Sequence, residues 1–155
     1  MNRATRRTAL AAAATALALG GVTATAAPAS ATSVTFASVP FGKDGSRALS
    51  VGIDGDHAGW VTFSSDPYTT TNGTYYKGDT LYVSDKRTDG FAIRGYVERV
   101  SNWTSTHHTT THGLKAPVRV SDTNNIKEGT RLRVKACVAK GSKIIKCSGW
   151  YGAHA

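Results

Sequence analysis

The stretch that decides the fold is Arg131-Leu132-Arg133-Val134-Lys135-Ala136-Cys137-Val138, near the end of the chain. Its apolar side chains occupy every second position, and basic or cysteine side chains fill the positions between them. Because successive side chains of a β-strand point to opposite faces, this alternation predicts a half-buried strand with one apolar and one basic face. Lys140-Gly141-Ser142 is predicted to be a hairpin turn, so Lys143–Trp150 should return as the partner strand.

The chain has two cysteines, Cys137 and Cys147, and they fall on the two strands of this predicted hairpin. If the turn centres on Ser142, the two residues lie opposite each other, close enough for a disulfide. A metal site or a catalytic thiol pair needs further ligands, which the neighbouring sequence does not offer. We therefore predict a structural disulfide, worth about 2–3 kcal/mol in the chain-entropy model.

Short runs rich in Val, Ile, Tyr, Phe and Thr recur between turn signals, and no stretch after residue 31 keeps a helical apolar period. Before the C-terminal hairpin, the predicted strands are Ser33–Val39, Ala48–Ile53, Gly59–Ser64, Gly73–Tyr76, Thr80–Ser84, Phe91–Arg99 and Val118–Ser121. This spacing predicts an all-β fold: a small antiparallel β-sandwich with one C-terminal hairpin disulfide, with a small barrel as the alternative.

The first 31 residues are typical of an export signal. Arg3, Arg6 and Arg7 precede a short alanine-rich apolar run, and Ala29-Ser30-Ala31 fits a cleavage site. The paired arginines also fit a twin-arginine signal, so both export routes stay open. The apolar run is too short and too rich in alanine for a membrane span. We expect a secreted, extracellular protein that begins near Thr32 and does not insert into a membrane.

Charge is unevenly distributed along the chain, which carries 19 Lys and Arg against 10 Asp and Glu. Residues 113–155 hold nine of the basic and two of the acidic residues. The predicted basic face of Arg131, Arg133 and Lys135 suits an acidic partner, and a merely solvated strand face is the alternative. Exposed aromatic side chains do not alternate with these cations in the sequence, so we expect no nucleic-acid binding.

Residues 32–45 are predicted to be an extended N-terminal arm and hinge, ahead of a single β-sandwich domain at 46–155. The apolar residues of the arm, which we expect to bind a partner, are Val34, Phe36, Val39, Pro40 and Phe41. Such an arm can pair with the sheet edge of another protein or fill its cleft. The alternative is that these residues form the first strand of the protein's own sandwich.

Residues suited to catalysis are sparse, and 155 residues are too few for a large multidomain enzyme. His107, His108 and His112 lie among Ser and Thr, so we predict a loop there and no metal site. His57 is close in sequence to Asp54 and Asp56, but no Gly-x-Ser-x-Gly elbow accompanies it. We predict a non-enzymatic protein without a cofactor. A small secreted hydrolase using His57 or the 107–112 histidines, or a protease inhibitor, is the alternative.

Several stretches resemble a group of small secreted actinobacterial proteins, typified by those of Streptomyces. They are Gly78–Asp85 with Asp89-Gly90, then Glu128-Gly129-Thr130, then Val134–Cys137 through Lys146–Trp150. In size, export signal and N-terminal segment, the chain also resembles the small adaptor subunit of umbrella toxin particles, which are secreted antibacterial assemblies. That resemblance implies no catalytic residue. It implies a protein-binding module that links larger subunits of the toxin complex, with Val34–Phe41 inserted into a partner's cleft.

Overall fold

The computed structural model describes residues 31–42 and 45–155, and these form strands and turns with no helix. The strands are β1 (Val34–Pro40), β2 (Arg47–Ile53), β3 (Asp56–Ser64), β4 (Tyr68–Thr69), β5 (Tyr75–Tyr76), β6 (Thr80–Asp85), β7 (Phe91–Arg99), β8 (Ser105–Thr110), β9 (Val118–Thr123), β10 (Arg131–Lys140), β11 (Lys143–Cys147) and β12 (Tyr151–His154). Residues 1–30 of the predicted export signal lie outside the described residues, and so do Lys43 and Asp44 of the predicted hinge.

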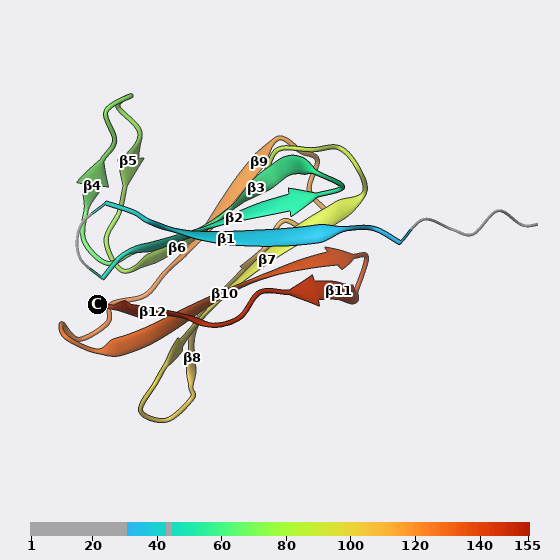
Figure 1. Ribbon diagram of the computed structural model, residues 1–155. Helices are drawn as coiled ribbons and strands as arrows, with labels where there is room; N and C mark the ends of the chain where they lie inside the picture. Colours follow the sequence, from blue (N-terminus) through green and yellow to red (C-terminus); the bar gives the residue numbers. More distant parts are fainter. Residues whose placement is uncertain (1–30, 43–44) are drawn as a thin grey trace, which may run out of the picture. The chain divides into compact units, whose positions relative to one another are not determined.

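Two antiparallel sheets form the layers of a sandwich, which confirms the predicted fold class (Figure 1). The first sheet has the strand order β1-β2-β3-β6-β9, and the second has the order β11-β10-β7-β8. Strand β12 also pairs with β10, so β11 and β12 share one edge of that strand. The short β4–β5 hairpin forms a small separate sheet and projects beyond the end of the first sheet (Figure 1).

One apolar core lies between the sheets and is built from alternate residues of their central strands. Its largest members include Leu49, Val51, Val61, Phe63, Leu81, Ile93, Val97, Leu132 and Val134. Gly95 of β7 lets the two layers approach closely, because a Cβ atom there would lie 2.7 Å from the Val83 side chain and 2.9 Å from that of Val61. A side chain at this position would push the sheets apart.

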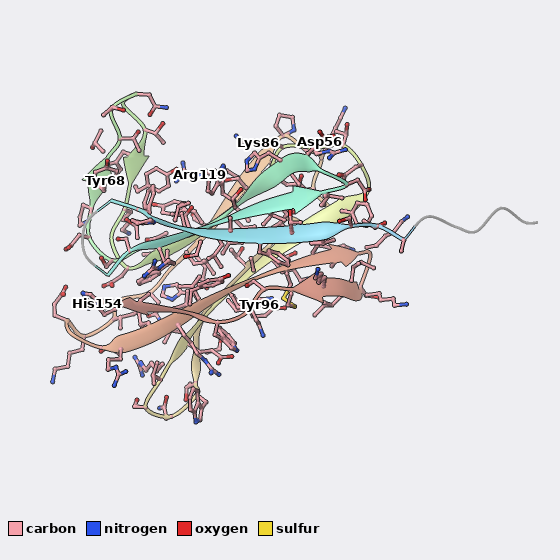
Figure 2. All side chains as sticks on the ribbon, viewed as in Figure 1. Asp56, Tyr68, Lys86, Tyr96, Arg119 and His154 are labelled. Carbon is pink, nitrogen blue, oxygen red and sulfur yellow. A yellow bond between two sulfur atoms is a disulfide. The ribbon has the colours of Figure 1, made fainter. Side chains whose placement is uncertain are left out.

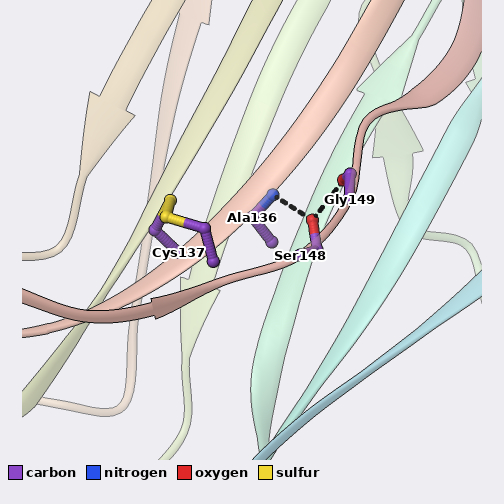
Figure 3. Close-up of a disulfide and its surroundings, with 5 residues drawn as sticks. Ala136, Cys137, Ser148 and Gly149 are labelled. Atoms are coloured by element: carbon purple, nitrogen blue, oxygen red, sulfur yellow. Dashed lines mark hydrogen bonds between the residues drawn. A yellow bond between two sulfur atoms is a disulfide. The ribbon is translucent and has the colours of Figure 1, made fainter.

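The C-terminal hairpin confirms the predicted alternation and the predicted disulfide. Cys137 and Cys147 are directly paired across β10 and β11, with their Cα atoms 4.0 Å apart, and they form a disulfide (Figure 3). The turn is not centred on Ser142, however, because Lys140 pairs with Lys143 around a two-residue Gly141-Ser142 turn. The ladder therefore needs one extra residue to bring the cysteines opposite each other.

A β-bulge supplies that extra residue. Val138 pairs with Lys146 and Ala139 pairs with Ile144, so Ile145 has no partner of its own. Further along, the Ser148 hydroxyl accepts a hydrogen bond from the Ala136 amide and donates one to the Gly149 carbonyl (Figure 3). This side-chain bridge interrupts the ladder, and the single return strand predicted for Lys143–Trp150 is instead split into β11 and β12.

Most of the histidine-rich stretch is a strand and not the predicted loop, although His112 lies in the turn that follows it. Residues Ser105–Thr110 form β8, which pairs with β7 at the edge of the second sheet. Its threonines are β-branched and suit a pleated sheet, which outweighs the polar character that favoured a loop. The alternation turns His107 into the interior, where it is 1% exposed, and leaves His108 in solvent.

Candidate binding surfaces

The five residues predicted to bind a partner are divided between the core and the surface. Val34 is buried in the core, and Phe36 packs against it. Pro40 is exposed at the end of β1, whereas Val39 and Phe41 line a pocket on the outer face of the first sheet. The structure thus places this segment as the first strand of the protein's own sheet, the alternative that the sequence left open.

The pocket that Val39 and Phe41 line has a volume of about 180 Å³. Small side chains on three neighbouring strands form its centre, namely Ala48, Thr62 and Ser84. Large rings surround them, with Trp60 and Tyr76 completing the lining. The pocket therefore exists because short side chains on the sheet lie between tall aromatic ones.

Aromatic side chains on this outer face pack on one another. Phe41 meets Tyr68 and Tyr76 edge to face, with ring centroids 5.6 and 4.7 Å apart, and Tyr76 meets Tyr82 in the same way at 5.0 Å. The Arg119 guanidinium lies 4.1 Å from the ring centroids of both Tyr76 and Tyr82. Tyr68 and Tyr76 belong to the β4–β5 hairpin and Arg119 to β9, and Figure 2 shows Tyr68 and Arg119. We call this surface the pocket face.

Both ends of the free edge of β1 are protected against pairing with a further strand. The Asp54 amide donates a hydrogen bond to the Ser33 carbonyl, so Ser33 is a residue whose backbone groups face β2. In an antiparallel pair such residues alternate with residues whose backbone groups face away, and in this register Phe36 and Ser38 face away from β2. The Lys146 ammonium donates to the Val34 carbonyl at one end, and Pro40 occupies the other end. Lysine and proline are residues that protect sheet edges against pairing. Strand addition at this edge is therefore limited to its centre.

The outer face of the second sheet carries the predicted basic residues together with aromatic rings. A row across the sheet consists of Trp150, Lys135, Tyr96 and His108. The Lys135 ammonium lies 4.2 Å from the Trp150 ring centroid and 5.1 Å from that of Tyr96, and the Tyr96 and His108 rings stack at 4.6 Å. We call this surface the cation face.

Arg133 lies between two tryptophans on the cation face. Its guanidinium is 4.1 Å from the Trp103 ring centroid and 4.2 Å from that of Trp150, and it forms an ion pair with Glu98 at 2.6 Å. The aromatic partners Tyr96 and Trp103 have no local signal in the sequence, because they are distant in sequence from β10. Strand pairing brings them to the basic residues, and only Trp150 carried a local signal.

His107 is a structural histidine at the junction of the two sheets. Its Nε2 atom donates to the Asp79 carbonyl at 2.9 Å, and its Nδ1 atom lies 3.1 Å from the Thr106 hydroxyl oxygen. Burial lowers the pKa of His107, which favours the neutral ring. Across residues 31–42 and 45–155, no three His, Cys, Asp or Glu side chains gather in a group that could hold a metal ion.

His57 lies on the pocket face, where its Nδ1 atom is 3.1 Å from the Ser50 hydroxyl oxygen. Partial burial of this largely exposed ring lowers the pKa of His57, and the nearby Lys86 lowers it further. Asp56 does not assist the imidazole, because its carboxylate forms an ion pair with Arg87 at 3.4 Å. A serine–histidine pair needs an orienting partner for the base to resemble a hydrolase triad, and no described carboxylate is hydrogen-bonded to the His57 ring.

No protein-family model, curated protein or solved structure that we compared with the chain matches it. In the described part of the chain, no helix has the length and apolar character needed to cross a membrane.

Proposed function

We propose that this protein is a non-enzymatic binding module that holds a partner protein on its pocket face. The observation that carries the proposal is the apolar pocket between Phe41, Trp60 and Tyr76, which lies on the solvent side of the sheet. Tyrosine, tryptophan and arginine are the residues most enriched at the energetic centres of protein interfaces. Here Trp60 and Tyr76 line the pocket, and Arg119 packs on the Tyr76 ring.

The size of the pocket suits one large apolar side chain of the partner. An apolar cavity of about 150 Å³ accommodates a benzene ring, and this pocket measures about 180 Å³. The Arg119 guanidinium on Tyr76 and Tyr82 supplies a polar rim beside it. Burying an aromatic or leucine side chain here would contribute about 1.5–3 kcal/mol.

We also propose that the protein is secreted and that its partner is a larger secreted subunit, as in an antibacterial toxin complex. The Cys137–Cys147 disulfide supports export, because disulfides persist in oxidising compartments. The export pattern of residues 1–31 and the resemblance to Streptomyces adaptor subunits support it further. N-terminal sequencing of the protein recovered from its native culture medium tests export. We expect the mature protein to begin near Thr32.

The binding proposal is tested by selecting ligands from a displayed peptide library on the immobilised protein. We expect the selected peptides to share one large apolar residue. Ala48→Leu should abolish their binding, because the added side chain fills the centre of the pocket from within. Ala37→Leu is the matched control, since Ala37 is exposed on the same face of β1 and lies outside the pocket.

Equal binding by the wild type, Ala48→Leu and Ala37→Leu would contradict the proposal, because the pocket would then play no part. Loss of binding in both variants would also contradict it. Both variants should give the wild-type circular dichroism spectrum, which separates loss of the pocket from loss of the fold.

A further inference from the structure

A second, charged hollow lies at one end of the cation face. Its volume is about 600 Å³, and the described residues that line it include Arg47, Arg131, Arg133 and His154 but no Asp or Glu. The register explains the space: Gly152 of β12 lies opposite Arg133. A Cβ atom at Gly152 would meet nothing within 4 Å, so this position leaves a gap in the row of side chains.

The hollow has an excess of positive charge. Arg133 forms an ion pair with Glu98, but among residues 31–42 and 45–155 no Asp or Glu side chain lines the hollow to balance Arg47 and Arg131. Arg47 comes from the first sheet and reaches across to donate through its Nε atom to the Gly152 carbonyl at 3.2 Å. Arginine side chains from both sheets therefore converge on one open space, an arrangement suited to a carboxylate or a similar anion.

We infer that this hollow and the adjoining cation face bind an extended, carboxylate-rich segment of a partner protein. Arg131, Arg133 and Lys135 project from alternate positions of β10, so they recur about every 6.8 Å. Acidic side chains at alternate positions of an extended peptide recur at the same interval. The repeat thus matches such a segment, and the complementary charge comes from Arg131 and Lys135, which form no ion pair with a described carboxylate as Arg133 does with Glu98.

The aromatic rings favour a peptide over single-stranded nucleic acid. Nucleic-acid platforms need free ring faces on which bases stack. Here Tyr96 lies between Lys135 of β10 and His108 of β8, and the Trp150 ring carries both Arg133 and Lys135. Cations and a neighbouring ring therefore already pack on both Tyr96 and Trp150.

Trp103 points independently to a ligand at this place. It is 59% exposed and has a φ of +57°, a left-handed conformation that bulky residues rarely adopt. Neither burial nor backbone geometry accounts for a tryptophan here, and its contact is with Arg133. Exposed residues in strained conformations concentrate at binding sites.

The test uses a fluorescent peptide of alternating glutamate and serine and measures its binding by anisotropy. Arg131→Glu and Gly152→Leu should each weaken binding by about tenfold or more, the first by reversing a charge and the second by filling the hollow. Lys143→Glu is the matched charge control, because Lys143 is exposed on β11 and lies outside the hollow. Gly149→Leu is the matched volume control, since a Cβ atom there also meets nothing within 4 Å.

Binding that weakens from low salt to about 0.15 M salt, falls in both test variants and persists in both controls supports the inference. Equal weakening by Lys143→Glu and Arg131→Glu overturns it, because net charge alone would then explain binding. Tighter binding of a single-stranded oligodeoxythymidine of equal charge also overturns it and makes the face a nucleic-acid surface. Arg131 is exposed, so its variant should fold even if Gly152→Leu does not.

This inference does not depend on the proposed function of the pocket face. Ala48→Leu should leave binding of the acidic peptide unchanged, and Arg131→Glu should leave binding of the library-selected apolar peptides unchanged. Failure of one site would therefore be recognised while the other still binds.

Discussion

The pocket face and the cation face both carry aromatic rings and arginine, but one contains an apolar pocket and the other is covered by charge. On the pocket face, short side chains (Ala48, Thr62, Ser84) lie between the rings, and an apolar pocket remains. On the cation face, Lys135 and Arg133 lie between the rings and fill the space with charge. The length of the side chains between the rings thus decides whether a sheet face keeps an apolar pocket or is covered by charge.

The largest expected effect tests whether β1 belongs to the framework of the pocket face. Deleting residues 32–41 removes Val34 from the core and exposes the edge of β2. We expect a loss of about 3 kcal/mol or more, since burial of each large apolar side chain contributes about 1.5–3 kcal/mol. Urea denaturation measures it. A free arm would instead leave the midpoint unchanged, and the pocket face would then lack its first strand.

The next largest effect concerns the support beneath the cation face. Replacing Cys137 and Cys147 together by alanine should lower the free energy of unfolding by about 2–3 kcal/mol in the chain-entropy model. Chemical denaturation of the double variant measures this loss, and reduction of the wild-type protein should reproduce it. A double variant as stable as the wild type would show that the neighbouring ladder and the Ser148 bridge hold the hairpin without the covalent link.

The sequence predicted the fold well where the signal is local. The alternation in 131–138 gave β10 its two faces, and the two cysteines located their own pairing. The half-residue error in the turn had no effect on that pairing, because the bulge at Ile145 compensates for it. Strands β4, β8 and β12 were not predicted. Strand β4 is very short, β12 follows the interruption of the ladder at Ser148, and β8 is rich in polar threonine and histidine.

The binding surfaces were less accessible from sequence, because each combines distant strands. The charged hollow brings together Arg47 and Arg131, and the cation face brings together Tyr96 and Trp150. Neither set has a fixed spacing that a motif could express. The apolar segment around Phe41 did stand out, but composition alone could not separate its inward side chains from its outward ones.

A smaller effect isolates the cost of Trp103 on the cation face. Glycine adopts the left-handed conformation freely, whereas alanine there costs about 1–2 kcal/mol. Trp103→Gly should therefore be more stable than Trp103→Ala by about 1 kcal/mol, because both variants lose the contact with Arg133 alike. Paired thermal melts measure the difference. Equal melting temperatures would show that the backbone at 103 is not held in this conformation, and one support for the acidic-ligand site would be lost.

The smallest effect concerns His107, which joins the two sheets beneath both faces through the Asp79 carbonyl. Burial lowers the pKa of His107 in the folded state, although Asp79 and Asp122 oppose this shift. The unfolded chain therefore binds a proton first as the pH falls through about 6.5, and stability should decrease below that pH. His107→Gln should flatten this part of the stability profile, and His57→Gln, at an exposed ring, should flatten it less. If the His107→Gln and wild-type profiles were parallel, His107 would not be the neutral link between the sheets.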